Sequence, residues 1–205
     1  MIKKNVKKLN GFNRIVLLLA LSDVFTWGSY TIISILTGIY LSNKFGEHTI
    51  TFVGVGTAIY FFTRATFQIP IGLITDKIKK DKDEITILFI GVLLMGLPFI
   101  FYPSITRNYQ FYILQFIFGL GASLNVTNWR KLFALNVDSG REGFQYAIYE
   151  TILSFSIAII SILGGYIANI SAQYFDALIS LGGVFIMLGS FWIILIYKYD
   201  DRNSK

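Results

Sequence analysis

The chain of 205 residues contains no cysteine and a single histidine. Without cysteine it has no disulfide, no thiolate metal site and no cysteine nucleophile. The histidine, His48, has no serine motif beside it, so the serine and histidine of an intramembrane hydrolase are missing. Clusters of His and Asp that could hold a catalytic metal are missing too. The sequence therefore predicts no enzyme, no catalytic residue, no metal site and no cofactor.

Charged residues are also scarce, at 15% of the chain against 54% hydrophobic residues. A soluble domain would carry about a quarter charged residues. The apolar residues gather in six stretches, and a helix needs about 20 such residues to cross a bilayer. We expect membrane-spanning helices at Ile15–Leu41, Ile50–Ile74, Ile85–Tyr102, Phe111–Lys131, Phe144–Ala168 and Tyr174–Tyr197. No linker or second zone of composition interrupts them, so residues 1–205 are expected to form one transmembrane domain.

Lysine and arginine are concentrated in alternate segments between these helices. Fifteen of the eighteen lie before the first helix, in the second and fourth connections, or after the last helix. The first connection holds only Lys44 and the third only Arg107. Because short cytoplasmic segments carry such an excess, the pattern predicts an all-α, multi-pass protein of the plasma membrane with both termini cytoplasmic. The same rule accounts for the net charge of +6, so no nucleic-acid partner is implied.

The six predicted helices differ in polarity in a repeating order. The first and fourth carry the most polar residues, the second and fifth carry fewer, and the third and sixth have almost none. A period of three helices indicates two three-helix repeats, an arrangement common in secondary transporters. Chance grading among six helices is the alternative. Glycines such as Gly91, Gly121 and Gly183 are expected to let helix backbones approach closely.

Two charged residues, Asp23 and Arg64, fall well inside the predicted helices. Asp23 lies nine residues past Arg14, about 13 Å along a helix, and Arg64 lies twelve residues before Asp76, roughly 18 Å from the same side. They can meet if the first two helices are neighbours. Since a charge in the bilayer is costly, both are expected to face the protein interior. They form either a site in which Arg64 holds a substrate anion and Asp23 carries a proton, or an ion pair that only orients two helices.

Further polar side chains inside the predicted helices are candidates for the wall of a polar cavity. They are Trp27, Tyr30, Gln115, Asn125, Asn128 and Glu150. Ordinary interhelical hydrogen bonding would explain each of them singly, and Glu150 can instead lie near water at the start of its helix. Their concentration on the first and fourth helices favours the cavity.

The connection between the second and third predicted helices has a distinctive pattern. It runs Gly72-Leu-Ile-Thr-Asp76-Lys77-Ile-Lys79-Lys80-Asp81-Lys82. This segment resembles the signature loop of the major facilitator superfamily, in which a glycine is followed four positions later by Asp and then by basic residues. The family usually has glycine where this chain has Lys79. Gly72 is expected to permit close helix contact, and Asp76 to meet a helix N-terminus or a cation.

Two further segments are similar to the same family. They are Gly119-Leu-Gly121-Ala-Ser with Arg130 at the end of the same helix, and Gly140-Arg141-Glu142-Gly143 before the fifth helix. The fifth helix has Ile160 and Ser161 where antiporters of the family have a Gly-Pro pair, so a drug–proton antiporter is not implied. The resemblance makes a set of residues candidates for the signature loop and a cytoplasmic gate. They are Gly72, Asp76, Lys77, Lys80, Arg130 and Arg141.

The resemblance implies a fold and a function. Typical members have twelve helices in two six-helix bundles. In each bundle the first and fourth helices line the substrate cavity, the second and fifth form the interface between bundles, and the third and sixth lie outside. The prediction is one such bundle: a half-size secondary transporter of small solutes that works by alternating access in the lipid bilayer, as a homodimer or with another six-helix half. The alternative is a non-transporting membrane scaffold or a truncated relic of such a transporter.

Overall fold

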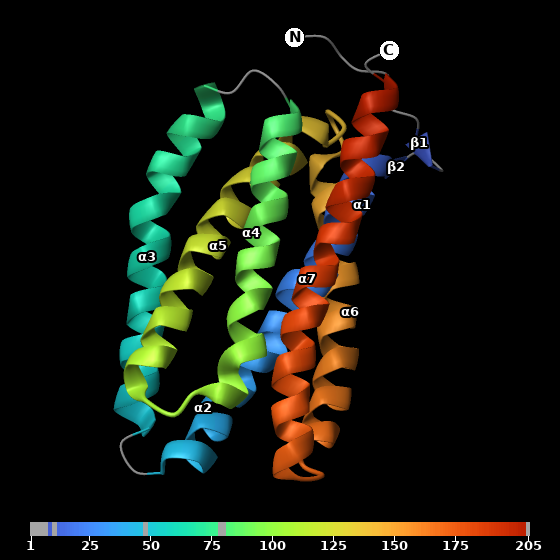
Figure 1. Ribbon diagram of the computed structural model, residues 1–205. Coiled ribbons are helices and arrows are strands. Elements are labelled where there is room, and N and C mark those ends of the chain that lie inside the picture. The colour runs from blue at the N-terminus through green and yellow to red at the C-terminus, as the bar shows by residue number, and fades with distance from the viewer. Residues whose placement is uncertain (1–7, 10–11, 47–48, 78–80, 204–205) are drawn as a thin grey trace.

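The chain folds into six long helical segments in the computed structural model, which describes residues 8–9, 12–46, 49–77 and 81–203 (Figure 1). The first segment consists of α1 (Arg14–Asp23), the five-residue π-helix η1 (Val24–Gly28) and α2 (Ser29–Phe45). The other five are α3 (Thr49–Lys77), α4 (Asp81–Phe101), α5 (Asn108–Asn136), α6 (Glu142–Ala168) and α7 (Ala172–Asn203). Each predicted span therefore lies on one helical segment, which extends beyond its predicted bounds at most ends.

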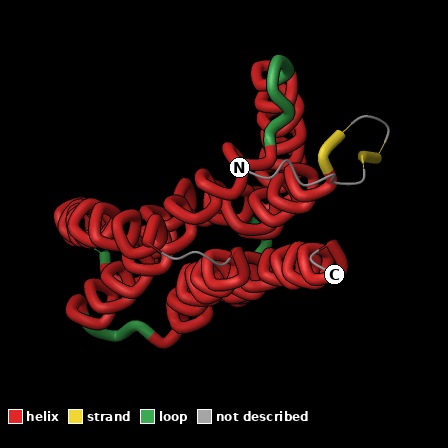
Figure 2. Tube along the Cα trace, turned by 90° about the horizontal axis from the view of Figure 1, so that it is seen from above, coloured by secondary structure: helices red, strands yellow, loops and turns green. Residues whose placement is uncertain are grey.

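Short elements complete the described chain. The strands β1 (Lys8–Leu9) and β2 (Phe12–Asn13) form an antiparallel pair that projects to one side of the bundle in Figure 2. A 3-10 turn, η2 (Tyr102–Ser104), follows α4. At the start of α1, Asn13 caps the helix, because its side-chain oxygen accepts a hydrogen bond from the backbone nitrogen of Ile15 at 2.9 Å.

The helices run in alternating directions, so the start of α1 and the end of α7 lie at the same end of the bundle (Figure 1). The end of α3, the start of α4 and the connection from α5 to α6 also lie at that end. Most of the cationic residues in the described part of the chain belong to this end. They include Arg14, Lys77, Arg130, Lys131, Arg141 and Lys198.

Five of the six helical segments are long and apolar enough to cross a membrane: residues 14–45, 49–77, 83–104, 142–168 and 172–198. The sixth, α5, is 29 residues long but too polar to join them. Its Asn125 and Asn128 are fully buried in the bundle. Because buried polar groups can be satisfied inside the protein, the lower apolarity of α5 is compatible with a place among membrane helices.

The closest packing in the bundle is centred on α4 and α5. α4 lies along both α5 and α7, and α3 lies along α5, whereas the first segment packs on α7 and α6. Glycine permits the closest crossing: a Cβ atom added to Gly91 would lie 2.7 Å from the backbone nitrogen of Asn125. A Cβ added to Gly121 would lie 2.8 Å from the backbone nitrogen of Met95. The α4–α5 crossing therefore needs small residues on both helices.

Two buried apolar clusters divide the bundle along its length. One contains Leu19, Trp129 and Phe133 and lies towards the end where α1 begins. The other is rich in aromatic rings, among them Tyr60 and Phe118, and lies towards the opposite end. Polar residues of the first segment and of α5 fall between the two clusters along their helices. A polar layer thus separates two apolar cores.

Candidate functional site

The first helical segment changes its hydrogen-bonding pattern where it reaches this polar layer. Asp23 ends α1, and Trp27 lies in the π-helical η1 that follows. Within this stretch the hydroxyl of Thr26 donates to the carbonyl oxygen of Ser22 at 2.9 Å. A π turn is rare, widens the helix locally, and is frequent at functional sites. It places Asp23 and Trp27 on the wall of the same cavity.

That cavity has a volume of about 300 Å³ and is partly open to the surface. Its wall comes from four of the six segments, namely the first segment, α3, α5 and α6, with none from α4 or α7. The lining residues are Asp23, Trp27, Arg64, Asn125, Val126, Trp129, Arg130, Tyr149 and Leu153. Four of the eight residues predicted for a substrate or proton site are therefore brought together: Asp23, Trp27, Arg64 and Asn125.

The carboxylate of Asp23 is buried, with 3% of the residue exposed. The hydroxyl of Tyr149 on α6 donates a hydrogen bond to Asp23 Oδ2 at 2.8 Å. The other oxygen, Oδ1, has no hydrogen-bond partner in the described part of the chain. A buried acceptor without a partner is costly, so Asp23 retains unused capacity to bind a donor.

Arg64 on α3 reaches the cavity from the other side. Its Nη1 donates to the hydroxyl of Tyr60 at 3.0 Å, and its guanidinium lies 5.9 Å from the ring centroid of Trp27, a cation–π contact. Between Asp23 and Arg64 the described structure has no ion pair within 4.0 Å. The two charges share a cavity instead of pairing directly, which leaves room for a solute between the helices that carry them.

Aromatic and amide groups connect the first segment to α5. Trp27 Nε1 donates to Asn125 Oδ1 at 3.0 Å, while the Asn125 amide nitrogen is buried without a partner in the described residues. Tyr30 meets Trp27 edge to face and stacks on Phe118 with the ring centroids 4.6 Å apart. Tyr30 therefore supports the cavity wall from behind and is not part of its lining.

The remaining predicted site residues lie outside this cavity. Gln115 donates to the hydroxyl of Tyr102 at 2.8 Å, nearer the opposite end of α5. Asn128 donates to the carbonyl oxygen of Leu124 at 2.7 Å on its own helix. Glu150 is exposed and lines a shallow hollow of about 440 Å³ formed by α6 residues alone. This hollow is larger but has no second helix to enclose a solute, so the interhelical cavity is the candidate site.

Four lining residues were not among the predicted site residues: the apolar Val126 and Leu153, and the hydrogen-bonding Tyr149 and Trp129. The charge of Glu150 made it the candidate on α6, although the adjacent Tyr149 is the residue that faces the cavity. The signal for Tyr149 in the sequence is a hydroxyl donor at about the depth of the Asp23 carboxylate. Trp129 donates to the carbonyl oxygen of Leu19 at 3.1 Å. Arg130 was predicted as a gate residue and lines the cavity itself.

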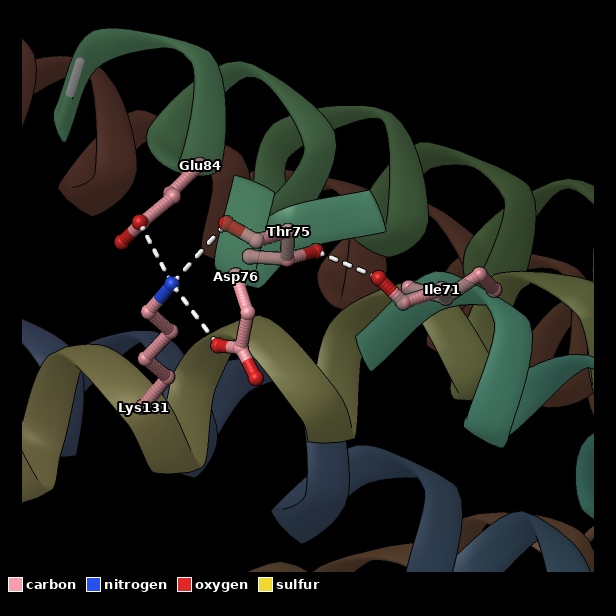
Figure 3. A network of polar contacts seen from close by, with 5 residues as sticks. All are labelled: Ile71, Thr75, Asp76, Glu84 and Lys131. Atoms are coloured by element: carbon pink, nitrogen blue, oxygen red, sulfur yellow. Dashed lines mark hydrogen bonds and ion pairs between the residues drawn. The ribbon is translucent and has the colours of Figure 1, made fainter. Parts of the chain in front are cut away.

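Lys131 joins three helices close to the signature loop (Figure 3). Its Nζ lies 3.1 Å from Asp76 Oδ1 on α3 and 2.9 Å from Glu84 Oε1 on α4, and it donates to the carbonyl oxygen of Thr75 at 2.9 Å. Asp76 thus meets a cation, one of the two partners that the sequence suggested. Glu84 is buried, whereas the Asp76 side chain is 73% exposed, so the contact with Glu84 is the better shielded of the two.

The other predicted loop and gate residues have varied surroundings. The expectation for Gly72 is wrong: an added Cβ would meet only Thr127 Cγ2 at an ordinary 3.7 Å, so no close contact requires glycine there. Lys77 is exposed, and Lys80 lies outside the described residues. The guanidinium of Arg141 lies 5.4 Å from the Phe144 ring centroid at the start of α6.

A family model described as Major Facilitator Superfamily matches residues 19–205, which include five helical segments in full, the first segment from Leu19 onward, and every residue of the cavity wall. No curated protein and no solved structure matches the chain.

Proposed function

The chain belongs to the major facilitator superfamily, a family of membrane transporters, and from this premise we propose that it is a half-size secondary transporter of a small solute. The observation that carries the proposal is the cavity between the first segment, α3, α5 and α6. It holds Asp23 and Arg64, charges that are costly in a membrane-spanning bundle and typically mark a solute or ion pathway. Transport would proceed by alternating access of this cavity to the two sides of the membrane.

The packing of the helices supports two three-helix repeats within the bundle. α5 contacts α3 and α4, and the first segment correspondingly contacts α6 and α7. The two helices α4 and α7 contact each other. This pattern is unchanged when the first segment is exchanged with α5, α3 with α6, and α4 with α7. The proposed repeats also agree with the order of polarity along the sequence.

The proposed topology places the termini in the cytoplasm. The end of the bundle where α1 begins and α7 ends carries Arg14, Lys77, Arg130, Lys131 and Arg141. A cytoplasmic face is the usual place for such an excess, and in a plasma membrane this would be the inner face.

We propose a second copy of the chain as the partner. In the most apolar 18-residue stretch of α6 only 6% is buried within the bundle, against 50% in that of α4. α3, on the other flank of the bundle in Figure 1, has 22%. Two copies inserted in the same direction can pair about a two-fold axis along the membrane normal, and two-fold symmetry is the commonest in homo-oligomers. Another six-helix half could serve in the same way.

A single cysteine in the cavity tests alternating access directly, because the natural chain has none. Val126→Cys introduces a thiol on the cavity wall. If the protein transports, a membrane-impermeant maleimide should modify this thiol both in right-side-out vesicles and in inside-out vesicles.

Two exposed positions provide the controls. Ser139→Cys, between α5 and α6, and Ser171→Cys, between α6 and α7, lie at opposite ends of the bundle and should each react from one side only. A Val126→Cys thiol that reacts from only one side would favour the alternative, a non-transporting scaffold or relic.

A further inference from the structure

The charged groups of the cavity wall do not balance. Two guanidinium groups, those of Arg64 and Arg130, line it together with one carboxylate, that of Asp23. Neither arginine forms an ion pair with a carboxylate in the described part of the chain. Arg130 is exposed near the end of α5, where water can screen its charge, but Arg64 lies deeper. An unpaired cation at that depth is unfavourable unless an anion joins it.

Hydrogen-bonding capacity at the same wall is also unfilled. Asn125 is fully buried, and its amide nitrogen has no acceptor in the described residues. Asp23 Oδ1 likewise has no donor. An amide nitrogen complements an oxygen of the solute, and a carboxylate oxygen complements a hydroxyl or amine hydrogen. A solute with both kinds of group would remove two orphaned polar atoms.

The remaining wall is apolar and aromatic. Trp27, Trp129, Val126 and Leu153 present large apolar surfaces between the charged groups. The volume of about 300 Å³ is at the lower end for binding sites of small molecules. These features favour a small solute with an apolar body over an inorganic ion.

Together these observations carry an inference that rests on the proposed transport function: we propose that the cavity binds a small organic carboxylate bearing a hydroxyl or amino group. The carboxylate would lie against the guanidinium of Arg64, the apolar body against the tryptophan rings, and the donor group against Asp23. A cationic solute would meet two guanidinium groups, and a neutral one would leave Arg64 without a counter-charge.

Intrinsic fluorescence gives a direct binding assay. The chain has three tryptophans, and two of them, Trp27 and Trp129, line the cavity. In Trp192→Phe, all tryptophan fluorescence therefore comes from the cavity wall. This variant, in phosphatidylcholine nanodiscs, would be titrated with lactate, benzoate and mandelate. Mandelamide and 2-amino-1-phenylethanol supply neutral and cationic relatives of mandelate. We expect saturable quenching by at least one carboxylate, and affinities at least about tenfold weaker for the neutral and cationic compounds.

Substitutions at Arg64 locate the bound carboxylate. Arg64→Gln should weaken carboxylate binding by about tenfold or more, and Arg64→Lys should restore part of it, because the charge remains but the planar fork is lost. Lys198→Gln removes an exposed cation at the end of α7, outside the cavity, and should leave binding unchanged. A bound carboxylate should also slow maleimide modification of Val126→Cys.

The outcomes separate this inference from the transport proposal. If no carboxylate quenches saturably, if the cationic compound binds more tightly, or if Arg64→Gln binds as the parent does, the carboxylate site is refuted. Reaction of the Val126→Cys thiol from both sides of the membrane would then still support transport of another class of solute.

Discussion

A buried carboxylate needs donors, and Asp23 has one in the described structure, the hydroxyl of Tyr149. This contact joins the first segment to α6, which packs against it. Hydrogen bonds between membrane helices contribute about 1 kcal/mol, and leaving a charged partner unpaired costs more. The contact therefore both positions Asp23 in the cavity and holds α6 against the bundle.

Replacing Tyr149 with Phe should lower the free energy of unfolding by about 1–2 kcal/mol, since the Asp23 carboxylate then loses its donor. The measurement is reversible unfolding in mixed detergent micelles. Tyr146→Phe serves as the control, because Tyr146 lies one turn away on an exposed face and its hydroxyl has no hydrogen bond within the described part of the chain. If Asp23→Ala, which removes the acceptor, and Tyr149→Phe have fully additive effects, the two side chains do not interact as the structure shows.

The sequence indicates how deep a polar residue lies in the bundle better than it indicates which way the side chain faces. The positions of Asp23 and Arg64 along their helices were enough to expect them in one polar layer, and both do line the cavity. Glu150 and Tyr149 are adjacent in sequence and lie at the same depth, yet Tyr149 faces the cavity and Glu150 is exposed. Which side of a helix faces its neighbours depends on how the helices pack. The number of polar residues in each helix does not determine this.

At the scale of helices, glycine sets how closely elements approach. α4 and α7 cross where a Cβ added to Gly183 would lie 2.6 Å from the carbonyl oxygen of Gly96 and 3.0 Å from Phe99 Cβ. Neither contact can be relieved by a side-chain rotation alone. The two helices would have to separate, and their contact is among the most extensive in the bundle.

Gly183→Ala should accordingly destabilise the bundle by about 1–3 kcal/mol, as overpacking does in other cores. Gly165→Ala on α6 is the matched control, because its added Cβ meets nothing within 4 Å. The control should be neutral or stabilising, since alanine favours a helix over glycine by about 1 kcal/mol. Equal unfolding free energies for the two variants would contradict the close crossing.

The π-helical η1 could not be predicted from the sequence. Residues 15–41 read as one continuous apolar helix, and Val24–Gly28 contains no proline to mark an interruption. A π turn arises when a wider turn lets side chains reach partners that a regular helix would miss. Here those side chains are Asp23 and Trp27, with partners on α6 and α5. The interruption therefore becomes visible only once the neighbouring helices are in place.

At the scale of the whole molecule, the number and the order of the helices followed from apolar run length. Both are local consequences of a bilayer about 30 Å thick. The three-helix link at Lys131 was not foreseen, because its partners Asp76 and Glu84 come from α3 and α4, far from it in sequence. Long-range contacts of this kind depend on the packed fold and not on any single segment.

The flanks of the bundle bear on assembly. α6 exposes large apolar side chains, among them Phe155, Ile159 and Ile162. Lipid could cover them, but the partly open cavity lies between the first segment, α3, α5 and α6. A second bundle placed on this side would close the cavity and enclose its charges. The exposed apolar side chains of α6 and the open cavity beside them thus both favour a partner bundle on this side.

Gentle extraction with lipid retained, followed by native mass spectrometry, should therefore give twice the mass of one chain. Ile159→Trp on α6 should reduce the dimer fraction severalfold, because a larger side chain would disturb the interface. Leu181→Trp on α7, equally exposed but on a helix outside the proposed interface, should leave it unchanged. A monomer that persists across lipids and detergents would contradict the homodimer and direct the search to a different six-helix half. Loss of the dimer on Leu181→Trp alone would move the interface to α7, where it could not close the cavity.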